Sequence, residues 1–378
     1  MHAIETTLIE AERLMTVCNS CRYCEGLCAV FPAMEMRRAF PRGDLNYLAN
    51  LCHGCGACYD DCQFAPPHEF NVNVPRILAR LRGESYQDYA WPRAFSGLFA
   101  RNGLAISLAT ALSVAAFVLG FAALNDPAIL LGRHVGPGAF YALMPHTAMA
   151  LLFGAAFLYA VVAIAMGVRL FWRDIQEPAA TLIEPRSLWQ AMKDASRLRY
   201  LDGGGVGCAD GDERVPDRRK LYHHLTFYGF LLCFASTVTA TLYHYLLGRE
   251  APYPWYDLPV LLGTFGGIGL VIGPAGLLAA KRQRDPALSD ETRLGMDIAF
   301  IAMLFLTGLT GLALVVFRET PTMGPLLALH LGVVFSLFLT MPYGKFVHGI
   351  YRFLALTRYA KESSALAAAG KSAAAGGA

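Results

Sequence analysis

Eight cysteines near the start of the chain form two groups with one shared spacing, C-x2-C-x2-C-x3-C. The first group reads CNSCRYCEGLC and the second reads CHGCGACYDDC. Short spacers let three thiolates curl round one cubane cluster, but the fourth lies too far along the chain to close the same cage. In paired ferredoxin motifs the fourth cysteine binds the other cluster. The spacing therefore predicts two [4Fe-4S] clusters, one held by Cys18, Cys21, Cys24 and Cys62 and the other by Cys52, Cys55, Cys58 and Cys28.

Zinc is the main alternative for so dense a thiol array. Zinc ribbons use paired C-x2-C units, however, and two runs of four cysteines fit cubane clusters better. Gly54 and Gly56 flank Cys55, where small residues give the backbone room to wrap a cluster. Bacterial ferredoxins place a proline directly after the fourth cysteine, whereas here a proline follows four residues later, as Pro32 and Pro66. This departure leaves the ligands intact but removes a basis for estimating the potentials.

Six of the ten histidines lie in or near apolar segments, where an ionisable side chain needs a partner. Two of these segments carry histidines near both ends. In one, His223 or His224 is separated from His244 by 20 or 21 residues, roughly 30 Å of helix; in the other, His330 and His348 are 18 residues apart, roughly 27 Å. If the two helices are antiparallel, His244 lies level with His330, and His223 or His224 lies level with His348.

Two levels of paired imidazoles suit bis-histidine ligation of one or two b-type haems. The alternative is that each histidine is hydrogen-bonded to a neighbouring helix. On an ideal helix His223 faces nearly the same side as His244, which favours it over His224, but both remain candidates. The sixth histidine, His146, is expected to have a packing role, with a quinone site or a replacement ligand as alternatives.

The composition shows which elements must position these residues. The chain is 55% hydrophobic and only 16% charged, which is typical of a membrane protein. Six apolar runs are long enough to cross a bilayer: 103–124, 146–171, 222–247, 257–280, 294–317 and 325–350. Gly263, Gly267, Gly269 and Gly273 in the fourth run are spaced for close helix packing and do not form a nucleotide-binding motif.

The distribution of charge predicts the orientation. The first 17 residues contain acidic residues where a secretory signal needs an apolar core, so the cysteine head is expected in the reducing cytoplasm. With six spans the C-terminus is then cytoplasmic as well. The predicted outer segments hold only Arg133, Arg249 and Arg318 of the 32 Lys and Arg residues, as the positive-inside rule requires. We expect a multi-pass protein of a bacterial inner membrane, with no nucleic-acid partner.

These observations predict a mainly α fold with four parts. A bacterial-ferredoxin-like head with two [4Fe-4S] clusters occupies residues 1–75, and a juxtamembrane connector, on the membrane surface or as a plain linking helix, occupies 76–102. Residues 103–350 form a six-helix transmembrane bundle resembling a dihaem cytochrome b, with a loop at about 173–221 that contains Cys208 as an unliganded thiol. Residues 351–378 form a tail that is expected to be disordered at its end.

The stretches LRYLDGGGVGC and RRKLYHHLTFYGFLLCFASTVTATLYHYL resemble the TcuB/CitB family of tricarballylate-utilisation electron-transfer proteins. The resemblance covers nearly the whole chain. It implies two [4Fe-4S] clusters, haem in the membrane part, reoxidation of a soluble flavoprotein dehydrogenase (TcuA-like), and transfer of electrons to the quinone pool. The histidine pair around the last span is also similar to that of the cytochrome b subunit of respiratory nitrate reductase, and the whole arrangement is similar to part of CobZ.

We therefore expect a membrane electron-transfer protein that acts as an oxidoreductase subunit, whose own residues position and tune the cofactors. One alternative is a membrane-anchored iron–sulfur redox sensor with structural histidines and no haem. Another is the reverse flow, from quinol to a cytoplasmic reductase. Tyr343, Lys345 and His348 form a plausible polar inner end for quinone, although Tyr and Lys usually anchor a span at the interface there.

Overall fold

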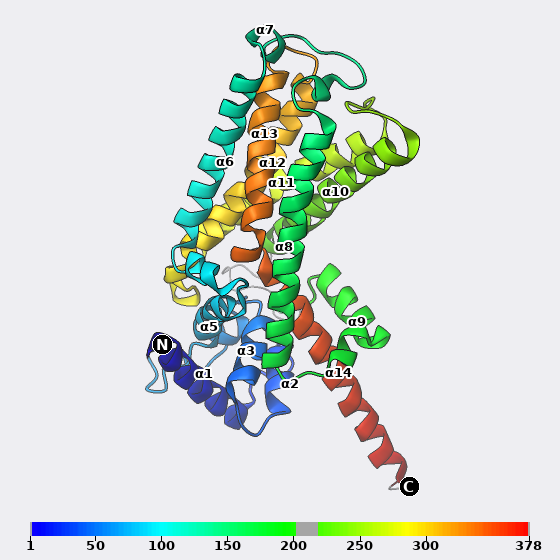
Figure 1. The fold of residues 1–378 in the computed structure, drawn as a ribbon. Helices are drawn as coiled ribbons and strands as arrows, with labels where there is room; N and C mark the ends of the chain where they lie inside the picture. Colours follow the sequence, from blue (N-terminus) through cyan, green and yellow to red (C-terminus); the bar gives the residue numbers. More distant parts are fainter. Residues whose placement is uncertain (1, 202–217, 377–378) are drawn as a thin grey trace.

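The computed structural model describes residues 2–201 and 218–376, which are helices joined by short connections and contain no strand. A small helical head lies at one end of a long helical bundle, and the first and last helices, α1 and α14, both lie at the head end (Figure 1). The predicted fold class, a mainly α chain with a head followed by six spans, is confirmed.

The head is built from five helices around one apolar core. They are α1 (His2–Cys21), α2 (Val30–Glu35), α3 (Arg42–Leu51), α4 (Ala57–Asp60) and α5 (Val74–Tyr89). The side chains of Leu78, Leu81 and Tyr86 on α5 are fully buried in this core. Residues 76–89 are therefore an integral part of the head, in contrast to the connector expected from residue 76 onward. Only the short turn η1 (Arg93–Phe99) links the head to the first span.

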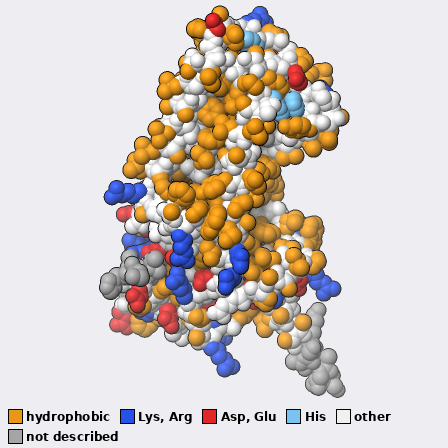
Figure 2. Space-filling view, in the orientation of Figure 1, with side chains coloured by type: hydrophobic (Ala, Val, Ile, Leu, Met, Phe, Trp, Pro, Cys, Tyr) orange, Lys and Arg blue, Asp and Glu red, His pale blue; other side chains and the backbone are white. Residues whose placement is uncertain are grey.

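The bundle contains six helices long and apolar enough to cross a membrane. Five match the predicted spans closely: α6 (Asn102–Leu124), α8 (His146–Asp174), α10 (Arg218–Leu247), α11 (Leu258–Gln283) and α12 (Leu294–Phe317). Large apolar side chains face outward along them, for example Leu112 at 69% and Leu151 at 70% exposure, as expected when lipid is the solvent. Hydrophobic side chains dominate the surface of the bundle, and Lys and Arg gather near the head (Figure 2).

The sixth span is shorter than predicted. Helix α13 (Met323–Thr340) continues as the short turn η6 (Met341–Tyr343), and the chain then extends at Gly344 before α14 (Val347–Gly376) begins. The predicted span to residue 350 is corrected, because Pro342 and Gly344 interrupt the helix. His348 and the predicted tail from residue 351 belong to α14, which runs along the head.

The glycines of α11 allow close helix packing, as predicted. A Cβ on Gly269 would lie 2.8 Å from the backbone of α10, and one on Gly273 would lie 2.6 Å from it. A Cβ on Gly267 would likewise lie 2.8 Å from the side chain of Leu312 on α12. Helix α10 therefore packs along α11 and leans away from the rest of the bundle (Figure 1).

The predicted loop at 173–221 contains structure of its own. The turn η3 (Ala179–Ile183) and the helix α9 (Pro185–Ser196) follow α8, and α9 packs against α14. The predicted loop thiol, Cys208, lies outside the described residues.

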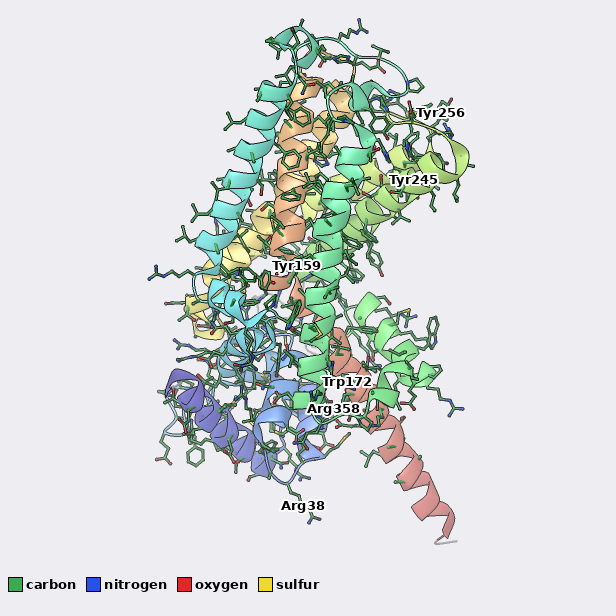
Figure 3. The ribbon with its side chains drawn as sticks, viewed as in Figure 1. Arg38, Tyr159, Trp172, Tyr245, Tyr256 and Arg358 are labelled. Carbon is green, nitrogen blue, oxygen red and sulfur yellow. The ribbon has the colours of Figure 1, made fainter. Side chains whose placement is uncertain are left out.

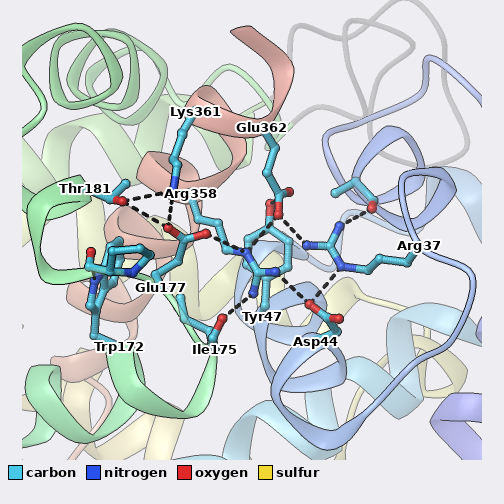
Figure 4. Close-up of polar contacts among 12 residues, drawn as sticks. Arg37, Asp44, Tyr47, Trp172, Ile175, Glu177, Thr181, Arg358, Lys361 and Glu362 are labelled. Atoms are coloured by element: carbon cyan, nitrogen blue, oxygen red, sulfur yellow. Dashed lines mark hydrogen bonds and ion pairs between the residues drawn. The ribbon is translucent and has the colours of Figure 1, made fainter. Parts of the chain in front are cut away.

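A network of ion pairs joins the head to α14 and to the end of α8 (Figure 4). Arg37 binds Asp44 at 2.9 Å and Glu362 at 2.6 Å, and Arg358 binds the same two carboxylates at 2.8 and 2.9 Å. Arg358 also lies 3.4 Å from Glu177, just after α8. The Arg37 side chain is 7% exposed. Because these charges are shielded from water and mutually paired, the head is fixed in place beneath the bundle.

Candidate functional site

The end of α1 and the turn after it place the first cysteines. Cys18 and Cys21 are three residues apart in the last turn of α1 and therefore lie on one face of that helix. The chain then turns at Arg22 and Gly26, which both have positive φ. Cys18, Cys21, Cys24 and Cys62 line one small cavity, with apolar walls from residues of the head alone.

A second cavity is lined by the remaining four cysteines, Cys28, Cys52, Cys55 and Cys58. The structure thus brings the thiols together in the crossed sets that the spacing predicts, with the fourth cysteine of each group lining the other group's cavity. Among the described residues no three Cys, His, Asp or Glu side chains converge as ligands of one metal ion. That arrangement suits a cubane cluster, whose four thiolates bind different irons and are spread round its corners.

The charge properties of these thiols also fit a cluster. Burial, and then the nearby Cys24, Cys62 and Cys21, raise the pKa of Cys18 to about 12. Burial and Cys52 likewise raise the pKa of Cys28. Crowded, buried thiols resist ionisation together unless positive charge is supplied among them, and the iron of a bound cluster supplies it.

Gly54 and Gly56 shape the backbone round the second cavity, as the sequence suggests. Their φ values are +58° and +100°, in the region that favours glycine. A Cβ on Gly56 would lie 2.8 Å from Leu288, and the backbone N–H of Gly54 donates to Cys52 Sγ at 3.3 Å. Glycine therefore allows both the turn and an amide hydrogen bond to a ligand sulfur.

The second cavity is the one that faces the bundle. Tyr200, which follows α9, contributes to its lining, and Leu288 on the connection between α11 and α12 packs against Gly56. Nearby, the Asn73 side chain donates to the carbonyl oxygen of Ala287 at 2.8 Å. The first cavity has no such neighbour from the bundle in its lining. The second cavity therefore lies nearer to the bundle than the first cavity does.

The inner histidines are His223 on α10 and His348 on α14. Burial, followed by Lys345 and Arg352, lowers the pKa of His348 well below its usual value, and His223 acts in the same direction. This shift favours the neutral imidazole, which is the form that binds a metal. The Nδ1 of His348 donates to the carbonyl oxygen of Lys345 at 2.5 Å, which leaves Nε2 for a ligand. His224 instead packs its ring against Tyr228 of its own helix.

A haem fits this inner site by the chemistry of its donors. His223 and His348 are two imidazoles from different helices, and Arg219, Arg352 and Lys345 lie within electrostatic reach of His223. Such basic groups are suitable partners for haem propionates. The separation of roughly 27 Å expected between His330 and His348 treats residues 330–348 as one helix and does not apply because of the break at Gly344.

The outer histidines are arranged differently from the prediction. The rings of His244 and His146 stack at 3.6 Å with an interplanar angle of 19°. Axial histidines approach a haem iron end-on, each through a ring nitrogen from an opposite face, so two rings stacked face to face are not arranged as an axial pair. His330 instead bonds through Nδ1 to Thr310 Oγ1 at 2.9 Å, beside Gly311 of α12. Because α10 leans away from the bundle, His244 meets α8 and does not pair with His330 in the described structure.

The polar inner end of the bundle is tied by internal contacts. Tyr343 bonds to Tyr159 of α8, with 2.5 Å between the hydroxyl oxygens, at the level where the bundle approaches the head (Figure 3). Lys345 lies 2.8 Å from Asp297 of α12. Both residues therefore hold helices together in addition to any contact with the interface. Asp297 was not singled out from the sequence, since its role depends on partners distant in the chain, whereas His146 packs against another side chain, as expected.

Comparisons with known proteins agree with this division of the chain. Residues 11–90 match the family described as Citrate utilization protein B Fer4-like domain, and residues 97–369 match Citrate utilization protein B. The Citrate utilization protein B of Escherichia coli is 50% identical over 354 residues, which cover 93% of this chain and 92% of that relative. No solved structure matches the chain. The boundary between the two family matches falls at the turn between α5 and the first span.

Proposed function

The chain belongs to the citrate utilization protein B family, and from that premise we propose that it carries electrons from a soluble flavoprotein dehydrogenase to membrane quinone. The Fer4-like domain gives it an iron–sulfur electron-transfer role. Two [4Fe-4S] clusters and a b-type haem would supply one-electron steps when bound. The observation that carries the proposal is that Arg352, one helical turn after His348 on α14, contacts the loop of the second four-cysteine cavity, so that the inner histidines lie next to the head.

The residues of the chain have distinct tasks in this function. The crossed cysteine sets hold two clusters close together inside one head, so that a flavin can pass on its two electrons one at a time. His223 and His348 hold one haem at the end of the bundle next to the head. We propose one haem at this level, because the outer histidines His244 and His330 are not brought together. The apolar bundle then gives quinone access from the bilayer.

The electron donor is proposed from the resemblance and from the relative. The E. coli relative is described as acting in citrate utilization, and tricarballylate is citrate without its hydroxyl group. A flavoprotein that dehydrogenates such a tricarboxylate releases an electron pair, which this chain would accept. We place the head and both termini in the cytoplasm, on the side to which most Lys and Arg residues belong, and the bundle in the bacterial inner membrane.

The first test is the cofactor content of the detergent-purified chain. We expect about eight non-haem irons and one low-spin b haem per polypeptide, with the haem seen in a reduced-minus-oxidised spectrum. Adding a soluble ubiquinone analogue to the dithionite-reduced protein, after excess reductant is removed, should reoxidise the haem. Clusters without haem in haem-sufficient cells would overturn the electron path and leave the sensor function. Haem that quinone does not reoxidise would overturn quinone as the acceptor.

A further inference from the structure

Two partly buried arginines bind the backbone at the first cysteine of the second group. Arg82 of α5 donates to the carbonyl oxygen of Cys52 at 2.6 Å and to that of Ala49 at 3.3 Å. Arg352 of α14 donates to the same Cys52 oxygen at 2.6 Å and to that of Asn50 at 3.4 Å. Two guanidinium groups from different helices therefore share one carbonyl group next to a cluster ligand.

Two further arginines reach the same loop from the bundle. Arg284, after α11, donates to the carbonyl oxygen of Gly54 at 2.6 Å. Arg219, at the start of α10, donates to the oxygens of Gly54 at 3.3 Å and His53 at 3.4 Å. We call this set the arginine cradle: Arg82, Arg219, Arg284 and Arg352. It surrounds the bundle side of the cavity lined by Cys28, Cys52, Cys55 and Cys58.

Two members of the cradle, Arg82 and Arg352, concentrate positive charge next to Cys52. Within residues 2–201 and 218–376, neither Arg82 nor Arg352 forms an ion pair with an Asp or Glu side chain. Burying like charges together is costly unless an anion compensates them. The negative charge of four thiolates exceeds the positive charge of an iron–sulfur core. A bound cluster with its four ligands is therefore an anion and compensates the arginines.

The first cavity has different electrostatic surroundings. Neither cavity has Lys or Arg in its lining, but the arginine that bonds the backbone beside the first cysteine group, Arg22 to the carbonyl oxygen of Asn19, is exposed to solvent. Asp61 directly precedes Cys62 in the chain and places a carboxylate near this set. A reduced cluster carries one more negative charge than an oxidised one. Positive neighbours therefore favour its reduction, and negative neighbours oppose it.

We propose that the arginine cradle raises the reduction potential of the cluster held by Cys28, Cys52, Cys55 and Cys58 above that of the other cluster. This inference rests on the proposed function and adds a direction to it. One electron leaves the cluster of the first cavity and one reaches the cluster of the second, with no proton or further reactant needed. The cradle thereby makes the second cavity the exit of the head, on the side of His223 and His348.

The test is a redox titration of the purified chain, monitored by electron paramagnetic resonance of the reduced clusters. Arg352→Gln keeps a hydrogen-bond donor but removes the charge, whereas Arg352→Lys keeps the charge. We expect Arg352→Gln to lower the upper of the two cluster potentials and leave the lower one in place. Arg352→Lys should restore the upper potential. Arg80→Gln, which changes an exposed arginine two residues before Arg82, is the matched control and should shift neither.

Several outcomes would overturn the inference. They are an unchanged upper potential, an equal shift of both potentials, or a Lys variant that behaves like the Gln variant. Iron and sulfide are measured in every variant, and if Arg352→Gln fails to assemble, Arg82→Gln tests the same charge from another helix. A wild-type chain without clusters would defeat the proposed function. Intact clusters with unresponsive potentials would defeat only the role of the cradle.

Discussion

Lys345 and Asp297 form an ion pair with a nitrogen–oxygen distance of 2.8 Å, which joins the extended segment after the sixth span to the start of α12. The second oxygen of Asp297 lies 2.6 Å from Lys281 at the end of α11. One carboxylate thus holds three parts of the bundle together directly beside the helix that carries His348. All three side chains are about one fifth exposed, so their charges are only weakly screened by water.

Replacing this carboxylate should loosen the inner end of the bundle. Asp297→Asn leaves two partly buried ammonium groups without a counterion, and we expect a loss of about 3 kcal/mol in stability. Thermal unfolding of the detergent-purified protein measures the effect as a lower midpoint. Glu291→Gln removes an exposed carboxylate just before the same helix and serves as the control. Equal midpoints for both variants would show that the ion pair contributes nothing.

The crossed cysteine sets predict which substitutions act alike. Cys62→Ala and Cys24→Ala should each remove the same paramagnetic signal and about half of the iron and sulfide. Cys28→Ala and Cys58→Ala should remove the other signal. The control, Cys233→Ala in α10, should leave both clusters in place. If Cys62→Ala instead matches Cys58→Ala, each group of four binds its own cluster and the crossed assignment is wrong.

Haem binding should depend on the inner histidines alone. His223→Ala and His348→Ala each remove one axial ligand, so we expect loss of the low-spin b spectrum in both. His224→Ala should retain it, because His224 packs against Tyr228. His330→Ala should retain it as well. The pyridine haemochrome content per polypeptide measures the result, and cluster iron in the same samples shows that the head has folded. Loss of haem in His224→Ala with retention in His223→Ala would exchange their roles.

The neighbouring residues Arg37 and Arg38 provide a matched test of the ion-pair network between the head and α14. Arg37→Ala leaves Asp44 and Glu362 without one of their partners, at a cost of about 3 kcal/mol in the local opening of α14. Amide hydrogen exchange in α14 should then be roughly 100-fold faster. Arg38 points away from the junction into solvent (Figure 3), so Arg38→Ala should leave exchange unchanged. Similar exchange in the two variants would contradict the role of the network.

Local patterns in the sequence were sufficient for the elements that they control directly. The spacing of the cysteines predicted the two sets that line the cavities, because a cluster ligand motif depends on short chain segments. Hydropathy predicted five spans to within a few residues, since each span depends mainly on its own length and composition. The sequence MPYG after α13 contained the signal for the early end of span six. Pro342 and Gly344 both oppose helix, but the apolar residues beyond them extended the predicted span.

Features that depend on distant contacts were not predictable in this way. His244 was assigned to His330 on the assumption of antiparallel, evenly packed helices, whereas the close contact of α10 with α11 carries it toward His146. The arginine cradle draws one residue each from α5, α10, α14 and the segment after α11. No spacing in the sequence relates these four positions, and only the folded head brings them to one loop.

Helix α14 carries His348 in its first turn, Arg352 one turn later, and Arg358 and Glu362 further along the same rod. The first contacts the proposed haem site, the second contacts the cluster loop, and the last two are fixed to the head. Electron tunnelling slows steeply as the gap between two centres widens. Because the single helix α14 contacts both the haem site and the cluster loop, it fixes the distance between the two cofactors. Movements of the spans in the lipid therefore leave the rate of electron transfer unchanged.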